Sequence, residues 1–183
     1  MGLFEYIMVL TSILIGLGVA ELLNGVVRML RSEFKEGIYL PQLFWAAYLF
    51  LFLIVIWWSR WDLNQNFHWT FTQLLLSLAG PVVVFILSGL VFPHNEQSRV
   101  YYFKHQKTFF TLLPFAAAIG LLHEILIEGT PVLSSTTLMG SMLVILSVIP
   151  RFSERDWVHL TCSVLINVLF LGWVLDVAYL IAS

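Results

Sequence analysis

The chain has 183 residues, of which 60% are hydrophobic and 11% are charged, and its mean hydropathy is +0.90. This composition lies outside the range of soluble domains and is typical of multi-spanning membrane proteins. The net charge of -2 argues against a nucleic-acid partner, and the single cysteine excludes an internal disulfide and a cysteine-cluster metal site.

The first apolar run, Leu3 to Arg28, is long enough to cross a bilayer, because a helix rises about 1.5 Å per residue and the hydrocarbon core is ~30 Å thick. Near its far end, the spacing of Glu21, Asn24 and Arg28 places them on one glycine-containing helix face that is predicted to point into the protein. We expect Arg28 to lean back through Asn24 toward Glu21 as a bridged polar chain. A structural clasp onto a neighbouring helix and a transport site both fit this pattern.

Five further apolar segments follow, separated by polar or turn-rich stretches, and each is predicted to form a helix. They are Leu40–Trp58, Trp69–Phe92, Tyr101–Ile127, Val132–Ile149 and Trp157–Ile181. Six spans with short loops use the whole length, so residues 1–183 are predicted to form a single transmembrane helical domain. The expected fold class is all-α, a polytopic bundle of about six transmembrane helices.

The distribution of basic residues gives an independent check on the number of spans. In the six-span arrangement one side takes eight of the nine Lys and Arg residues, and the other side takes Arg60. The eight are Arg28, Arg31, Lys35, Arg99, Lys104, Lys107, Arg151 and Arg155. Because cytoplasmic loops collect Lys and Arg, we expect a multi-pass cell-membrane protein with both termini on the non-cytoplasmic side.

Tryptophans gather near both ends of the predicted spans. Trp45 and Trp157 fall near the basic side, and Trp57, Trp58, Trp61 and Trp69 fall near the other. This distribution is typical of interfacial aromatic belts, although an aromatic cage for a cation is an alternative around Trp57, Trp58 and Trp61.

Ionisable side chains at bilayer depth identify the candidate sites, since an ionised carboxylate there costs about 2.5–3.5 kcal/mol. Besides Glu21, they are His123 and Glu124 in the fourth segment and Asp176 in the sixth. His123 and Glu124 are predicted to point in different directions. The second histidine of a His-Glu-x-x-His zinc motif is missing, so no metal site is predicted.

Glu124 and Asp176 are expected at a similar depth in the membrane. We predict that they form one polar cluster with Thr137 or Ser141 of the fifth segment, in which two acids can share a proton. Alternatively, each acid binds a nearby hydroxyl or amide and serves only to hold helices together.

The sequence contains no glycine-rich phosphate loop and no serine nucleophile motif, and no cofactor is predicted. The intramembrane acids favour a small inner-membrane protein that is channel- or transporter-like, for an ion or a proton-coupled small solute. Two alternatives stay open: a non-transporting subunit, sensor or scaffold of a membrane complex, and an intramembrane enzyme acting on lipid. Homo-oligomerisation in the lipid bilayer is also expected, because so small a bundle buries few helix faces.

Overall fold

The computed structural model describes residues 3–31, 39–59, 70–93, 97–127 and 129–182, with the description of residues 3–4 and 176–182 confined to the backbone. These residues form six α-helices and one short 3-10 turn, with no strand among them. They are α1 (Leu3–Arg31), α2 (Leu40–Ser59), α3 (Phe71–Val91), α4 (Ser98–Leu126), α5 (Ser135–Val148), η2 (Ile149–Phe152) and α6 (Asp156–Ala182). The predicted all-α six-helix bundle is thereby confirmed.

Each of the six helices is long and apolar enough to cross a membrane when α5 is counted together with η2. The predicted bounds hold to within a few residues. Residues 101–107, at the start of the fourth predicted segment, belong to the continuous helix α4. α5 begins later than predicted, because Ser134 caps it by accepting a hydrogen bond from the Thr137 amide at 3.1 Å.

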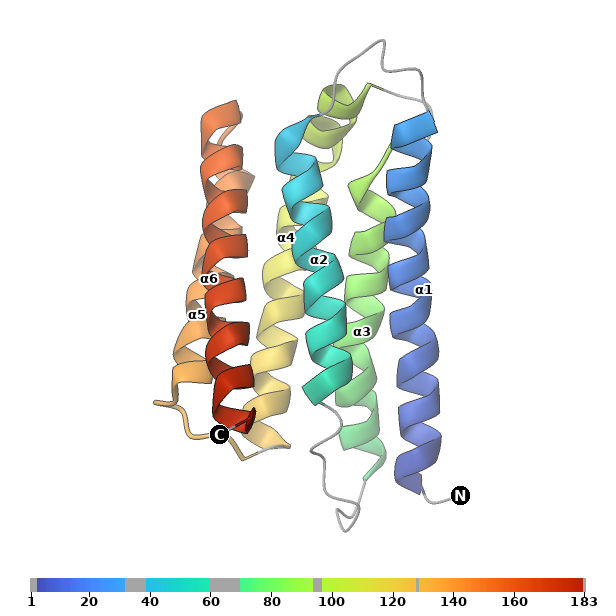
Figure 1. Ribbon diagram of the computed structural model, residues 1–183, viewed down its shortest axis with the longest axis vertical. Coiled ribbons are helices and arrows are strands. Elements are labelled where there is room, and N and C mark those ends of the chain that lie inside the picture. The colour runs from blue at the N-terminus through green and yellow to red at the C-terminus, as the bar shows by residue number, and fades with distance from the viewer. Residues whose placement is uncertain (1–2, 32–38, 60–69, 94–96, 128, 183) are drawn as a thin grey trace.

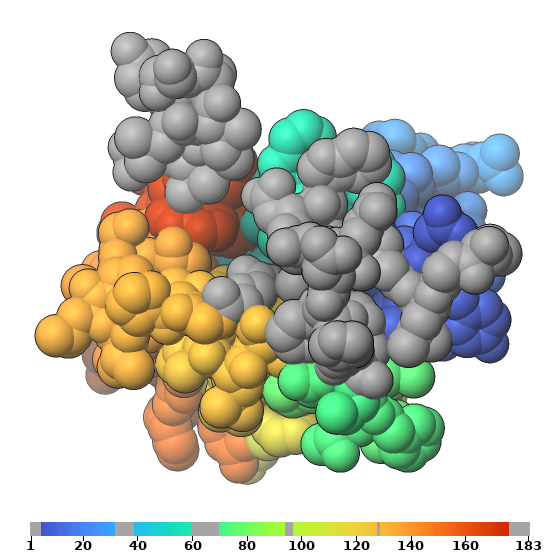
Figure 2. Space-filling model, turned by 90° about the horizontal axis from the view of Figure 1, so that it is seen from below, coloured from blue at the N-terminus to red at the C-terminus, as the bar shows by residue number. Residues whose placement is uncertain are grey.

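Five of the helices form a ring. α2 packs against α3, α3 against α4, α4 against α5 and α5 against α6, and α6 returns to α2. α1 lies outside this ring, against α3 and α2, at one side of the molecule (Figure 1). In the view from the end that carries both termini, α1 (blue) and α5 (orange) lie at opposite edges (Figure 2).

The glycines of α1 explain how closely it approaches the ring. A Cβ atom on Gly25 would clash with the ring of Phe92, and one on Gly18 would lie 3.0 Å from Cδ1 of Leu53. Both glycines are buried, so this face of α1 packs against α2 and the end of α3.

Both chain ends lie at the same end of the bundle, as an even number of crossings requires (Figure 1). The opposite end, called the basic end below, holds the beginnings of α2, α4 and α6 and the far ends of α1, α3 and η2. All described Lys and Arg residues belong to these segments or to the connection between η2 and α6: Arg28, Arg31, Arg99, Lys104, Lys107, Arg151 and Arg155. Lys35 and Arg60 lie outside the described residues, and for the other basic residues the predicted clustering at one end is present in the fold.

Candidate functional site

A partly open pocket of about 110 Å³, called the ring pocket below, lies between the five helices of the ring. It lies in the half of the bundle nearer the chain termini, because its walls come from the second halves of α2, α4 and α6 and the first halves of α3 and α5. Its walls are mainly apolar and aromatic, with a few polar groups. The residues that matter below are Tyr48, Phe52, Gly120, His123, Glu124, Thr136, Phe170 and Trp173. An apolar cavity with few convergent polar groups is the usual form of a small-molecule site.

Two of the predicted site residues, His123 and Glu124, line this pocket together. They can do so although they point in different directions, because consecutive helix positions differ by about 100° and a pocket bounded by several helices spans that arc. His123 is 4% exposed, and a hydrogen bond of 3.0 Å joins its Nε2 to Oγ of Ser77. His123 thus ties α4 to α3 while one edge of its ring contributes to the pocket wall.

The pocket wall also contains a hydrogen-bond donor. The indole nitrogen of Trp173 is buried and has no hydrogen-bond acceptor among the described residues. Within the same part of the chain, no three His, Cys, Asp or Glu side chains are grouped closely enough to hold a metal ion. The polar groups of the pocket wall are therefore a carboxylate, an imidazole and hydroxyl groups, with the indole N–H of Trp173 buried beside them.

The described contacts concern only some members of the cluster predicted around Glu124 and Asp176. Thr137 and Ser141 donate to backbone carbonyls of their own segment, Thr137 to Pro131 at 3.1 Å and Ser141 to Thr137 at 2.8 Å. Hydroxyls near a helix start commonly bond to local carbonyls in this way, and the expected role of Thr137 or Ser141 as a partner of the acids stays a prediction. The side chain of Asp176 lies outside the described residues, and its pairing with Glu124 stays a prediction.

The remaining predicted site residues, Glu21, Asn24 and Arg28, lie on α1 and do not line the pocket. Arg28 Nη2 donates directly to Glu21 Oε1 at 3.2 Å, with side-chain exposures of 36% and 30%. Asn24 is exposed, so the predicted bridged chain through it is wrong. The reason is the reach of arginine: two helical turns separate the residues, roughly 10 Å along the axis, and the side chain leans toward the N-terminus.

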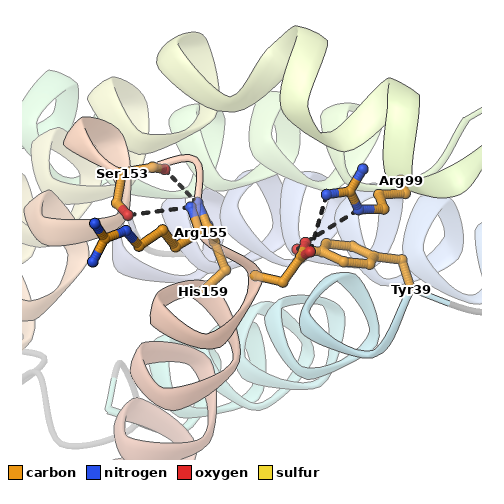
Figure 3. Close-up of polar contacts among 6 residues, drawn as sticks. Tyr39, Arg99, Ser153, Arg155 and His159 are labelled. Atoms are coloured by element: carbon orange, nitrogen blue, oxygen red, sulfur yellow. Dashed lines mark hydrogen bonds and ion pairs between the residues drawn. The ribbon is translucent and has the colours of Figure 1, made fainter.

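Sequence reasoning missed a buried polar chain at the basic end. Trp45 Nε1 donates to the Tyr102 hydroxyl at 3.1 Å, and this hydroxyl is 2.8 Å from Nδ1 of His159. His159 Nε2 in turn is 2.7 Å from the Ser153 carbonyl (Figure 3). Because indole can only donate and a carbonyl can only accept, the tyrosine donates to Nδ1 and the neutral histidine donates from Nε2.

The polar chain is surrounded by aromatic rings that contact one another edge to face. Trp45 contacts Phe109 and Phe110 with centroid separations of 6.0 and 5.2 Å, and Tyr102 contacts Phe110 at 6.1 Å. Trp45 is 1% exposed, so its predicted place in an interfacial belt is wrong, whereas Trp157 is 63% exposed, as a belt residue should be. This aromatic layer, defined as these four side chains with His159, fills the ring between the pocket and the basic end.

An exposed cluster lies beyond the aromatic layer. Arg99 donates to the Asp156 carboxylate through Nε and Nη2 at 3.2 and 2.9 Å, and the Tyr39 hydroxyl donates to it at 2.9 Å (Figure 3). Burial and this hydrogen bond raise the pKa of the Tyr39 phenol above its ordinary value, so the phenol stays protonated as a donor. The cluster joins the beginnings of α2, α4 and α6.

A glutamine fixes the connection between α5 and α6 to the ring. Gln106 of α4 is 5% exposed, and its side-chain nitrogen donates to the carbonyls of Pro150 and Ser153 at 2.7 and 2.8 Å. These carbonyls lie at the end of a helical segment, where backbone acceptors have no partner within the helix. In the sequence, Gln106 lies between other polar residues, and nothing distinguishes it from them.

Comparison with models of protein families, with curated proteins and with solved structures finds no match for this chain.

Proposed function

We propose that this chain is a transporter-like membrane protein in which the ring pocket holds a small ion or a proton-coupled solute during its passage. The observation that supports the proposal is the position of Glu124, a carboxylate on the wall of an apolar cavity formed by five apolar helices. An acid at this depth is costly unless it has a partner, water or a proton, and such residues commonly mark transport pathways.

The aromatic layer favours a transporter over an open channel. Trp45 and Phe110 are each 1% exposed, and they fill the ring on the side of the pocket that faces the basic end. A solute in the pocket must therefore wait for a rearrangement before it can continue. In transporters, access to a central site alternates through movements of this kind.

Proton coupling is part of the proposal, because the pocket wall includes titratable groups. The described ones are Glu124 and His123 of α4 and Tyr48 of α2. A proton on Glu124 removes the charge that a cationic solute would neutralise, so proton binding and solute binding compete there.

The test is uptake into proteoliposomes that contain the purified protein and an internal pH dye. Sodium, benzyltrimethylammonium, benzenesulfonate and xylitol serve as probes of different charge and polarity. Uptake of at least one probe above that of protein-free liposomes is expected, together with a proton flux. Glu124→Gln should abolish this flux, and Glu21→Gln, which removes an acid outside the pocket, should preserve it. Uptake equal to that of empty liposomes for all four probes would contradict the proposal.

A second candidate function, an intramembrane hydrolase acting on lipid, is favoured by the hydrogen bond between Ser77 and His123. Serine nucleophiles are activated by a histidine at this distance. However, Ser77 is 1% exposed and is not among the residues that line the pocket. Labelling by a fluorophosphonate probe that is lost in Ser77→Ala would establish the hydrolase, and absence of labelling favours the transporter.

A further inference from the structure

The ring pocket carries a pattern of charge that selects among solutes. Glu124 is the only Asp, Glu, Lys or Arg among the described residues that line it. The described Lys and Arg residues lie in the half of the bundle nearer the basic end, and none of them lines the pocket. A full negative charge in a poorly polarisable environment attracts a cation strongly and repels an anion.

One wall of the pocket is aromatic. Tyr48 and Phe52 of α2 are stacked with a centroid separation of 5.7 Å, and Phe170 of α6 contacts both, at 5.3 and 6.0 Å. Trp173 extends this wall, with its ring 5.8 Å from that of Phe170. Aromatic faces attract cations through their quadrupole, and walls of this kind recognise quaternary ammonium groups.

The size of the pocket limits the rest of the ligand. Its volume of about 110 Å³ is somewhat smaller than the ~150 Å³ cavity that accepts benzene in an engineered protein. One ring, or an aliphatic group of similar size, fills such a space. A ligand that carries both a ring and an ammonium group is larger than this space, so part of it must extend beyond the partly open pocket.

Two groups at the wall would favour an anionic ligand, namely the imidazole of His123 and the buried indole N–H of Trp173. These groups present dipoles in their neutral forms, whereas a carboxylate presents a full charge. Since His123 already shares its Nε2 with Ser77, its capacity to bind an anion is reduced. The charge of Glu124 therefore dominates.

We propose that the ring pocket binds a monovalent organic cation with a single ring or an apolar group of that size, its ammonium group placed between Glu124 and the aromatic wall. This inference rests on the proposed function, for which it names the substrate class. It predicts discrimination by charge at equal ring size.

The test is calorimetric titration of the purified full-length chain with benzyltrimethylammonium, benzenesulfonate and benzyl alcohol, which share one ring and differ in charge. Binding of the cation is expected to be roughly tenfold or more tighter than that of the other two. Glu124→Gln should weaken cation binding by a similar factor, and the matched Glu21→Gln should leave it unchanged. Equal binding of the three probes, or a preference for benzenesulfonate, would overturn the inference.

A second pair of variants keeps the test decisive if Glu124→Gln fails to fold. A Cβ on Gly120, which lines the pocket, would meet no atom within 4 Å, and the same is true of Gly16 on α1. Gly120→Leu therefore begins its side chain in open space at the pocket wall and should abolish binding of the cation, whereas Gly16→Leu should not. Unchanged binding in Gly120→Leu would place the site elsewhere and refute the inference.

The failure of this inference is distinguishable from that of the proposed function. Uptake of benzenesulfonate or xylitol into proteoliposomes, without binding or uptake of benzyltrimethylammonium, would refute the inference of a cationic substrate and leave the proposed transport function standing. Binding of the cation without uptake of any probe would retain the site and refute transport.

Discussion

Replacing Gln106 by methionine is expected to loosen the basic end of the ring. Methionine keeps the length of the side chain but cannot donate, so the carbonyls of Pro150 and Ser153 lose the donor that now lies at 2.7 and 2.8 Å. Side-chain hydrogen bonds in membrane proteins average ~0.6 kcal/mol, and those in soluble proteins reach ~1.5 kcal/mol. Losing both bonds should therefore destabilise the packing of the α5–α6 connection against α4 by roughly 1–3 kcal/mol. The equilibrium constant for opening of this contact should rise roughly 5- to 150-fold.

Cys162 provides the assay, because it is the single cysteine of the chain and is 8% exposed in α6. When closing is faster than labelling, the rate at which a thiol reagent modifies Cys162 follows the opening equilibrium. The rate in Gln106→Met should rise by the factor given above. Gln73→Met is the matched control, since Gln73 acts only in the exposed capping box of α3. Equal rates in Gln106→Met and the parent, or equal increases in both variants, would refute the reasoning.

Four further predictions follow from the described contacts. Tyr102→Phe removes a hydroxyl that both accepts and donates in the buried polar chain, so it should lower the melting temperature of the purified protein. Tyr6→Phe, at an exposed position, should leave the melting temperature unchanged, and equal melting temperatures for the two variants would contradict this prediction. Because the folded-state pKa of Tyr39 is raised, its contribution to stability is complete below the ordinary tyrosine pKa of about 10 and is lost as pH rises beyond it. Thermal unfolding of Tyr39→Phe should therefore depend less steeply on alkaline pH than that of the parent, and parallel curves would exclude this contribution. Glu21→Gln retains a hydrogen-bond acceptor for Arg28 and should elute like the parent in gel filtration. Glu21→Leu leaves Arg28 without this acceptor and should be less stable. Identical behaviour of the two variants would show that the pair of Glu21 and Arg28 is dispensable. Reporter fusions at Ser183 should show a non-cytoplasmic C-terminus, and cytoplasmic reporter activity would invert the proposed orientation.

The helices could be predicted from the sequence because their signal is local. An apolar run of about 20 residues bounded by polar stretches is sufficient to indicate a span. The distribution of Lys and Arg then fixes which helix ends lie together, and the fold agrees with it. Only the ends of the helices needed finer information, as Ser134 shows, since several hydroxyls near the start of α5 were equally good candidates for its cap.

The site could be predicted only in part, because it depends on which helices are neighbours. Glu124 was identified as costly at its depth, but the sequence does not indicate that α2 and α6 complete a pocket around it. Tyr102 and His159 occur singly among apolar residues, and their partnership joins helices that are far apart in the chain. Glu21 carried an equally strong local signal, but α1 packs outside the ring.

The ion pair between Glu21 and Arg28 bears on how the chain enters the membrane. Segments are synthesised in chain order, so α1 is made before α3, the helix against which it packs. An acid that depended on a partner from a later helix would meet lipid alone, at a cost of about 2.5–3.5 kcal/mol. Because its counter-charge belongs to the same helix, Glu21 is compensated as soon as α1 has formed. α1 can therefore be inserted and oriented by itself, with Arg28 and Arg31 retaining its end at the basic side while the ring helices are still being made.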